Sequence, residues 1–358
     1  MEFCKTTEVQ TYLIWVFREF AHSDTSRSTP SWSISKQEGT ARLPKTPLRY
    51  PGGKSRAVET IMPYIRNLDC GELCSPFLGG GSIELKCAEE GMTVHGYDLF
   101  QPLVWFWQAL LSDPEKLLEY INEYRHNVRD YTDEAILFRE AAKMCKVKNC
   151  LSKGNHTEYC SHHRDIQRIW QNDMLGVPKQ VFTDMRELVN SRTTVKNRDK
   201  LFRAAAQYYI VNRTSFSGAT TSGGWSWKAS WARLTQNTLD NLSKFRVDNF
   251  VVRNADFNVS IAEHPDAGLY LDPPYCLNKE TGNNGTNRET LYGTEGDHHE
   301  GFDHVGLANV LKSREKWVLS YNNCEYVRNL YDGYKIVEVD WAYGMNSTKE
   351  SSEILIIG

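Results

Sequence analysis

The chain has 358 residues, 40% of them hydrophobic and 24% charged, and a formal net charge of -3. This length can bury a large core, and this charge excludes a uniformly basic nucleic-acid coat but not a local basic face. The longest apolar run near the N-terminus, residues 12–17, is too short to span a bilayer and lacks the flanks of a signal peptide, and nine mostly scattered cysteines argue against a disulfide scaffold. We therefore expect a cytoplasmic protein.

The first 44 residues carry little structural signal. Residues 21–40 are rich in Ser and Thr, and no apolar period persists through them. We expect a poorly ordered leader over 1–44.

From Leu48 onward, strand and helix patterns alternate. Helices are predicted at 54–68, 82–90 and within 102–143 and 164–211; strands are predicted at 72–75, 93–97, 250–253, 268–271, 317–320, 335–339 and 354–357. This order predicts an α/β fold with an open, mostly parallel, Rossmann-like sheet and an inserted, mainly helical region. Ligands of such sheets bind beyond the carboxyl ends of the strands.

Three segments fall on that predicted rim. The sequence "SPFLGGGSIEL" (75–85) puts Gly79, Gly80 and Gly81 between a strand and a helix, where the backbone can approach a ligand. Asp98 ends the next strand, where an acid can accept from ribose hydroxyls or simply cap the next helix. In "GLYLDPPY" (268–275), a buried strand runs into Asp272, whose carboxylate can accept from a bound amine, beside the Pro273 carbonyl.

The stretch 145–164 contains a cysteine and histidine cluster. Its spacing fits a closed tetrahedral zinc set formed by Cys145, Cys150, Cys160 and His163. His162 is a rival for the fourth ligand, and free cysteines in a loop are the alternative. A zinc ion here would be structural, because the segment has too few apolar residues to fold alone.

Positive charge is concentrated around this cluster. Residues 141–203 hold 13 Lys and Arg against 6 Asp and Glu. Such a surplus suits contacts with nucleic-acid phosphates, although a solvated helix face is the ordinary explanation. The following stretch, 215–234, combines Gly, Ser and Trp with Lys228, and we interpret it as a loop that orders on a partner.

Taken together, the segments "RYPGGKSR" (49–56), "PFLGGGSIEL" (76–85) and "DPPY" (272–275) resemble the Dam-type, D12 class DNA adenine N6-methyltransferases, the alpha group of amino methyltransferases. The resemblance covers roughly 47–358. It implies a Rossmann-like methyltransferase domain at 45–112 and 245–358, with a target-recognition insert at 113–244.

The resemblance also implies S-adenosylmethionine as cofactor and methyl donor. Its implied contacts are Tyr50, Lys54, Phe77, Gly79, Gly80, Gly81, Asp98, Asp256 and Asp272. Besides Asp98, two of these have ordinary alternatives: Lys54 as the solvated first turn of its helix, and Asp256 as a strand-end turn. Asp272, Pro273 and Tyr275 are the implied catalytic residues: the first two accept from the amino group of a flipped adenine, and the Tyr275 ring stacks on the base.

Double-stranded DNA is the implied partner, and the sequence indicates neither a membrane nor an obligate protein partner. The expected DNA contacts are Asn212, Arg213, Ser215 and Lys228. Alternatives to adenine methylation are the same fold acting on cytosine N4 or on RNA, and a catalytically silent DNA-binding protein. A biological role such as restriction-modification does not follow from the motifs.

Overall fold

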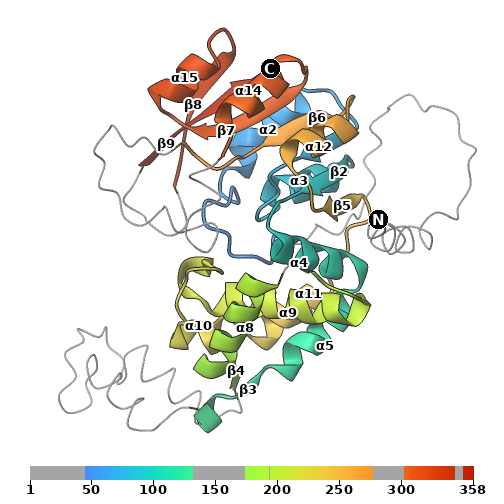
Figure 1. Cartoon of the computed structure of the whole chain (residues 1–358), viewed down its shortest axis with the longest axis vertical. Coiled ribbons are helices and arrows are strands. Elements are labelled where there is room, and N and C mark those ends of the chain that lie inside the picture. Colours follow the sequence, from blue (N-terminus) through green and yellow to red (C-terminus); the bar gives the residue numbers. More distant parts are fainter. Residues whose placement is uncertain (1–44, 132–173, 193, 277–301, 343–349) are drawn as a thin grey trace, which may run out of the picture. The chain divides into compact units, whose positions relative to one another are not determined.

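The computed structural model describes residues 45–131, 174–192, 194–276, 302–342 and 350–358. It contains a seven-stranded sheet, in the upper half of Figure 1. These residues belong to one compact unit, 42–358. The predicted leader, 1–44, lies outside the described residues. None of the described helices is long and apolar enough to cross a bilayer.

The sheet confirms the predicted mostly parallel α/β class. In the order β5-β2-β1-β6-β7-β9-β8, its strands are β5 (Phe250–Arg253), β2 (Thr93–Tyr97), β1 (Glu72–Ser75), β6 (Gly268–Leu271), β7 (Trp317–Asn322), β9 (Glu350–Ile357) and β8 (Lys335–Ala342). The first five are parallel, and β9 is antiparallel to both β7 and β8. The chain builds outward from β1 to β5 and then returns to β6 on the other side of β1. The strand order therefore reverses between β1 and β6, where sheets of this kind bind ligands.

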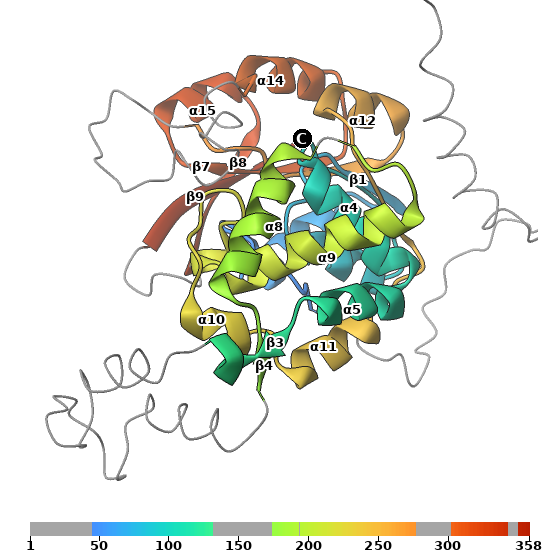
Figure 2. The same cartoon turned by 60° about the horizontal axis from the view of Figure 1, so that its bottom comes forward.

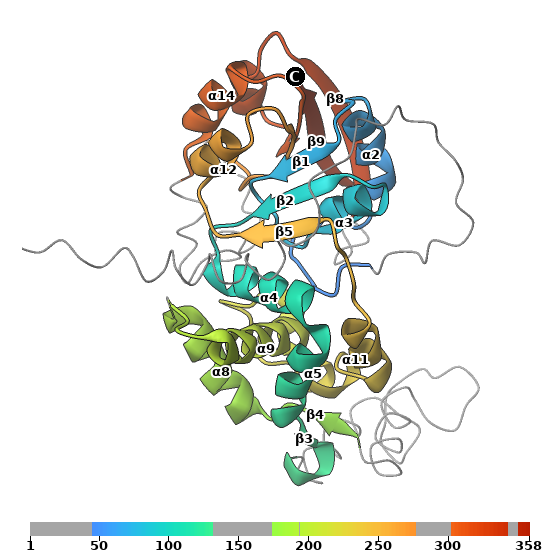
Figure 3. The same ribbon diagram turned by 90° about the vertical axis from the view of Figure 1, so that its right-hand side faces the viewer.

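Alternating side chains give the sheet two buried faces, because successive residues of a strand point to opposite sides. One face, which includes Leu73 and Tyr270, packs in a core with α2 (Val58–Arg66), α3 (Ser82–Glu89) and α4 (Gln101–Ser112). The other, which includes Cys74 and Leu271, packs in a core with α12 (Phe257–Glu263), α14 (His304–Lys312) and α15 (Glu325–Leu330). Figure 3 shows α12 and α14 on the opposite side of β1, β2 and β5 from α2 and α3.

A group of helices joins the sheet through α4. Its remaining members are α5 (Pro114–Glu123), α8 (Lys179–Ser191), α9 (Arg198–Thr214), α10 (Trp227–Ala232) and α11 (Gln236–Ser243). Helix α9 packs against α4, α5 and α8 (Figure 2), and α4 also packs against β5. The buried rings of Phe106 and Tyr209 stack with centroids 5.4 Å apart, so the aromatic stripe of α4 is core, as its helical spacing predicts.

Short elements complete the described part of the chain. They are the paired strands β3 (His126–Asn127) and β4 (Leu175–Gly176), and the 3-10 turns η1 (Val128–Tyr131) and η2 (Phe216–Gly218).

The helix predicted at 54–68 is shorter than the apolar period indicates. It begins only at Val58, and Lys54 lies before it in a turn closed by the Ala57 N–H donating to the Lys54 carbonyl at 2.9 Å. The Lys54 side chain is only 4% exposed. The alternative of a solvated first helical turn is therefore wrong for this residue.

Candidate active site

The glycine-rich loop and the DPPY segment lie next to each other. Strands β1 and β6 pair in parallel, with Leu73 opposite Gly268 and Cys74 opposite Leu269. The loop follows the end of β1, and Asp272 directly follows the end of β6. Both segments therefore leave the same edge of the sheet at the point where its strand order reverses.

The three loop glycines are required by two aromatic side chains that pack on them. Gly79 and Gly81 have φ values of 48° and 67°, which L side chains rarely adopt. A Cβ on Gly79 would lie 2.8 Å from the Tyr50 ring, one on Gly80 would lie 2.9 Å from the Tyr50 Cβ, and one on Gly81 would lie 2.7 Å from Trp107. The Trp107 indole also donates to the Gly79 carbonyl at 3.2 Å. Tyr50 and Trp107 thus fix the shape of the loop, and Tyr50 lies against it.

Asp98 links the glycine-rich loop to the end of β2. Its Oδ2 accepts from the Gly79 N–H at 3.0 Å and its Oδ1 from the Phe100 N–H at 2.8 Å. The second bond steadies Phe100, the residue that precedes α4, but α4 has no side-chain cap, so Asp98 is not a helix cap. Asp98 thus places a carboxylate beside the glycine-rich loop at the end of β2.

Phe77 and Asp256 bring an apolar group and a carboxylate to the same rim. The Phe77 ring lies 6.0 Å from Phe257 and 5.5 Å from Phe302, measured between centroids. Asp256 is the N-cap of α12, where its Oδ1 accepts from the Asn258 backbone at 2.8 Å and from the Asn258 side-chain amide at 2.7 Å. The strand-end interpretation of Asp256 therefore describes its local structure.

Lys54 contacts two residues of the DPPY segment. Its Nζ donates to Asp272 Oδ1 at 2.7 Å, to Asp272 Oδ2 at 2.8 Å and to the Tyr275 hydroxyl at 2.9 Å. The Asp272 side chain is 21% exposed. Burial raises the pKa of Asp272, and the charge and hydrogen bonds of Lys54 oppose that rise. The ionised carboxylate of Asp272 therefore depends on Lys54.

Two further carboxylates lie near this pair, and sequence reasoning missed both. Glu353 on β9 is 1% exposed, and its Oε2 lies 3.8 Å from Lys54 Nζ. Glu84 on α3 is buried and accepts from the Ser75 hydroxyl at 2.6 Å, and burial raises the pKa of Glu84 to about 7. The signal for Glu353 was present in the sequence, since it is a charged residue directly before the apolar run "ILII".

The chain after Tyr275 is tied to the neighbouring strand by one amide. Asn322, at the end of β7, accepts from the Cys276 N–H at 3.0 Å and donates to the Cys276 carbonyl at 2.9 Å. The Tyr275 ring lies 6.1 Å from the Tyr321 ring. The position of Tyr275 beyond the sheet edge is therefore supported from β7 as well as from Lys54.

The four residues expected to contact DNA have different surroundings. Asn212 is buried, and its amide bonds the Arg49 backbone N–H and carbonyl and the Gly218 carbonyl at 2.8 to 3.2 Å. Ser215 is also buried, whereas Lys228 is exposed. The Arg213 guanidinium donates to the carbonyls of Arg233 and Pro47. Of the four, Asn212 and Ser215 are thus held inside the chain.

Three arginines gather at the base of the segment 215–225. Burial and mutual repulsion lower the pKa of Arg49, beside Arg213, and lower the pKa of Arg233 to about 10, beside both of the others. The Arg49 Nη1 atom is buried without a hydrogen-bond partner in the described part of the chain. The adjacent Phe216 side chain is 64% exposed. This arrangement concentrates positive charge beside an exposed aromatic ring.

The predicted zinc ligands Cys145, Cys150, Cys160 and His163 lie outside the described residues.

A family model described as D12 class N6 adenine-specific DNA methyltransferase matches residues 50–345. This range holds the glycine-rich loop, Asp98, the group of helices and the DPPY segment, and it ends before Glu353. No curated protein matches the chain.

Proposed function

Because the chain belongs to the D12 class of N6 adenine-specific DNA methyltransferases, which methylate adenine N6 in DNA with S-adenosylmethionine, we propose that its reaction takes place at the edge between β1 and β6. The observation that carries this location is the Asp272 carboxylate, held by Lys54 beside the glycine-rich loop. We also propose that the substrate is duplex DNA with a defined target sequence, from which the adenine is flipped out.

The rim residues fit S-adenosylmethionine by the chemistry of their side chains. Asp98, already fixed by the loop, has acceptor capacity for ribose hydroxyls, and the Phe77 ring offers an apolar face to the adenine of the cofactor. Asp256 contributes a second acceptor near Phe77, and Tyr50 lines the loop. When bound, the cofactor supplies a methyl group on a sulfonium, so the N6–C bond forms as the C–S bond breaks and its electron pair stays on sulfur.

Asp272 and Pro273 orient the target amine in this proposal. The Asp272 carboxylate and the Pro273 carbonyl accept hydrogen bonds from the two N6–H groups, which turns the nitrogen lone pair out of the ring plane. Positive charge develops on N6 as the bond forms, and a fixed carboxylate stabilises that charge. N6 then loses one proton, which the neighbouring Asp272 carboxylate accepts. Residue Tyr275 supplies the stacking face for the flipped base.

Lys54 must share Asp272 with the substrate, because its ammonium now bonds both oxygens of the carboxylate. Glu353 lies 3.8 Å from Lys54 Nζ and provides a second acceptor. We therefore assign Glu353 the role of a positioning residue: Lys54 moves toward it when the adenine amino group binds Asp272. The cation stays close enough to keep Asp272 ionised.

Tyr275→Ala is expected to weaken binding of the flipped adenine by roughly 10- to 100-fold, because base–aromatic stacking contributes about 1–3 kcal/mol per base. Tyr275→Phe is the matched control, since it keeps the ring and loses only the hydroxyl that bonds Lys54 at 2.9 Å. The measurement is the fluorescence of an adenine analogue at the target position, which brightens on leaving the stack. If the two variants gave the same fluorescence, Tyr275 would not be the residue on which the flipped base stacks.

We propose that residues 113–244 form the target-recognition region. Support comes from the basic surplus of 141–203, the arginine group of Arg49, Arg213 and Arg233, and the exposed side chains of Phe216 and Lys228. Arginines suit phosphate contacts, and an exposed ring can stack on a base. Asn212 and Ser215 would then act on DNA indirectly, by holding the segment that carries Phe216.

A structural zinc ion bound by Cys145, Cys150, Cys160 and His163 remains a proposal from the spacing. Purified protein is expected to contain about one zinc ion per chain at this set. Metal analysis of the full chain and of the Cys145→Ser/Cys160→Ser variant checks this. Equal zinc content in the two proteins would contradict it.

The experiment for the whole proposal is expression in cells that lack adenine methylation, followed by single-molecule sequencing of their DNA. One consistent motif methylated on adenine is expected, and protection of that motif from a nuclease would support a restriction-modification role. Methylation of defined oligonucleotides in vitro completes the test, because transfer only to cytosine or only to RNA would overturn the proposal.

A further inference from the structure

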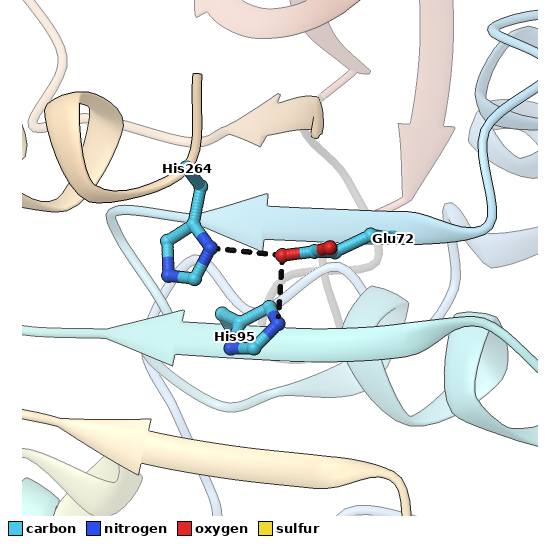
Figure 4. A group of neighbouring side chains, drawn as sticks. All are labelled: Glu72, His95 and His264. Carbon is cyan, nitrogen blue, oxygen red and sulfur yellow. Dashed lines mark hydrogen bonds and ion pairs between the residues drawn. The ribbon is translucent and has the colours of Figure 1, made fainter. Parts of the chain in front are cut away.

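A second group of side chains with binding chemistry lies away from the active site. Glu72 opens β1, His95 is in the middle of β2, and His264 follows α12. The register places Glu72 and His95 on the same sheet face as Cys74 and Tyr97, the face covered by α12. Glu72 lies at the opposite end of β1 from the glycine-rich loop. Figure 4 shows the three side chains converging on one point.

The convergence is on a single atom, Glu72 Oε1. His95 Nε2 lies 3.0 Å from it, His264 Nδ1 lies 2.9 Å from it, and all three ligand atoms are within 4.8 Å of one another. The His95 and His264 side chains are 18% and 11% exposed, whereas Glu72 is 48% exposed. Two nearly buried imidazoles therefore share one carboxylate oxygen that solvent can still reach.

The far side of His264 is already fixed by a second hydrogen bond. Tyr97 donates its hydroxyl proton to Glu263 at 2.7 Å, so its oxygen accepts from His264 Nε2, which lies 2.9 Å away. The Nδ1 lone pair of His264 then faces Glu72 Oε1 across 2.9 Å. Two electron-rich atoms this close require a positive centre between them, either a proton or a metal ion.

We propose that Glu72, His95 and His264 bind a divalent transition metal ion, for which zinc has the right ligand chemistry. Imidazole and carboxylate are common zinc ligands, and tetrahedral bonds of about 2.0–2.1 Å place ligand atoms roughly 3.3 Å apart. The present separations of 2.9 and 3.0 Å differ from that by a few tenths of an ångström. The hydrogen bonds that run from His264 to Tyr97 and from Tyr97 to Glu263 hold the imidazole in place, as the partners of metal-binding histidines usually do.

The ion would be structural. It would join the start of β1, the middle of β2 and the residue that ends α12, three segments distant in sequence. The exposed side of Glu72 leaves room for a water molecule in the fourth position. This site does not depend on the proposed function, since none of its ligands lies at the edge between β1 and β6.

The test measures the thermal unfolding midpoint of the metal-free full chain before and after addition of zinc. Zinc at roughly 100 times its dissociation constant is expected to raise the midpoint by a few degrees. In the Cys145→Ser/Cys160→Ser background, where the cysteine set cannot contribute, the rise should disappear in Glu72→Gln and His95→Ala and persist in His126→Ala, which replaces an exposed histidine. Glu72→Gln is the sharpest variant, because the amide keeps the size and polarity of the side chain but binds zinc poorly.

Cobalt(II) separates this site from the cysteine set at 145–163. Thiolate ligands give cobalt intense near-ultraviolet charge-transfer bands, whereas imidazole and carboxylate ligands give only weak visible bands. We expect weak visible bands that survive Cys145→Ser/Cys160→Ser and vanish in Glu72→Gln. If no such bands arise, or if Glu72→Gln retains them, the three residues form a hydrogen-bonded group only and the metal site is refuted.

Discussion

Replacing Asp272 by alanine is expected to reduce methyl transfer by about 10³-fold or more, since removing one preorganised group that stabilises transition-state charge already costs roughly 10²–10³-fold. Asp272 has two tasks in the proposed reaction, holding the amine and stabilising the charge on it. The two other carboxylates described near it are already engaged: Glu353 lies 3.8 Å from Lys54 Nζ, and Glu84 is bonded to Ser75.

The measurement is single-turnover methylation of a duplex that contains the target sequence. Binding of S-adenosylmethionine, measured by calorimetry, should weaken much less than transfer, because the substitution removes one implied contact, Asp272, and leaves the loop and Asp98 unchanged. Asp272→Asn, close in size, guards against a folding defect, and Asp266→Ala is a control at an exposed carboxylate. If Asp272→Ala retains activity within about tenfold of the parent, the mechanism is wrong, since tenfold is only about 1.4 kcal/mol.

The sheet and its rim could be predicted because their signals are local. A buried strand such as β6 shows as the apolar run "GLYL", and the polar Asp272 directly after it marks the strand end. Glycines at 79–81 between a strand and a helix mark the loop. The carboxyl ends of parallel strands meet at one edge, so these two motifs had to share an edge once the sheet was parallel, and the pairing of β1 with β6 makes them neighbours.

The partners of Lys54 could not be predicted, because they depend on how distant strands lie over it. Lys54 comes before α2, Asp272 after β6, and Glu353 in β9, whose direction relative to β7 follows from the fold rather than from its own pattern. Side chains alternate along β9, so Glu353 must lie on one of the two faces of the sheet. The sequence does not say which face contacts a cation. Only the assembled sheet brings one ammonium between two carboxylates.

Asn212 illustrates the same limit for recognition. A polar residue at the end of a basic helix was expected to contact DNA, yet its amide satisfies the backbone of Arg49 and Gly218. A buried polar backbone needs partners, and a side chain from a neighbouring helix supplies them here. The sequence shows which residues can form hydrogen bonds and does not show which of them the fold uses internally.

Lys54→Met is expected to lower activity most strongly at low pH and to destabilise the fold. Lys54 lowers the pKa of Asp272 while burial raises it, so without Lys54 the pKa of Asp272 rises further. The ionised carboxylate then predominates only at higher pH. At any pH below the pKa, each unit by which the pKa rises lowers the ionised fraction of Asp272 about tenfold. The acidic limb of the kcat profile should therefore shift to higher pH.

Stability should change in the opposite direction with pH. In Lys54→Met the folded pKa of Asp272 lies above its unfolded value, so the folded state binds more protons between the two values and loses stability as pH rises through that window. Breaking a buried pair by removing one partner costs about 3–5 kcal/mol, and the partial exposure of Asp272 favours the lower end. The loss should be largest above the folded pKa, where two carboxylates, Asp272 and Glu353, have no ammonium beside them.

The measurements are kcat from pH 5.5 to 9.5, a working window set around neutral pH, and the unfolding free energy at both ends of it. Lys54→Arg keeps the charge and should leave the acidic limb near its original position even if kcat falls, because the planar guanidinium fits the site differently. Lys86→Met removes a lysine paired with Glu89 on the surface and should change neither quantity. If the acidic limb of Lys54→Met coincided with that of the parent, Asp272 would not depend on Lys54 for its charge. Glu353 would then lose its proposed role as the second acceptor.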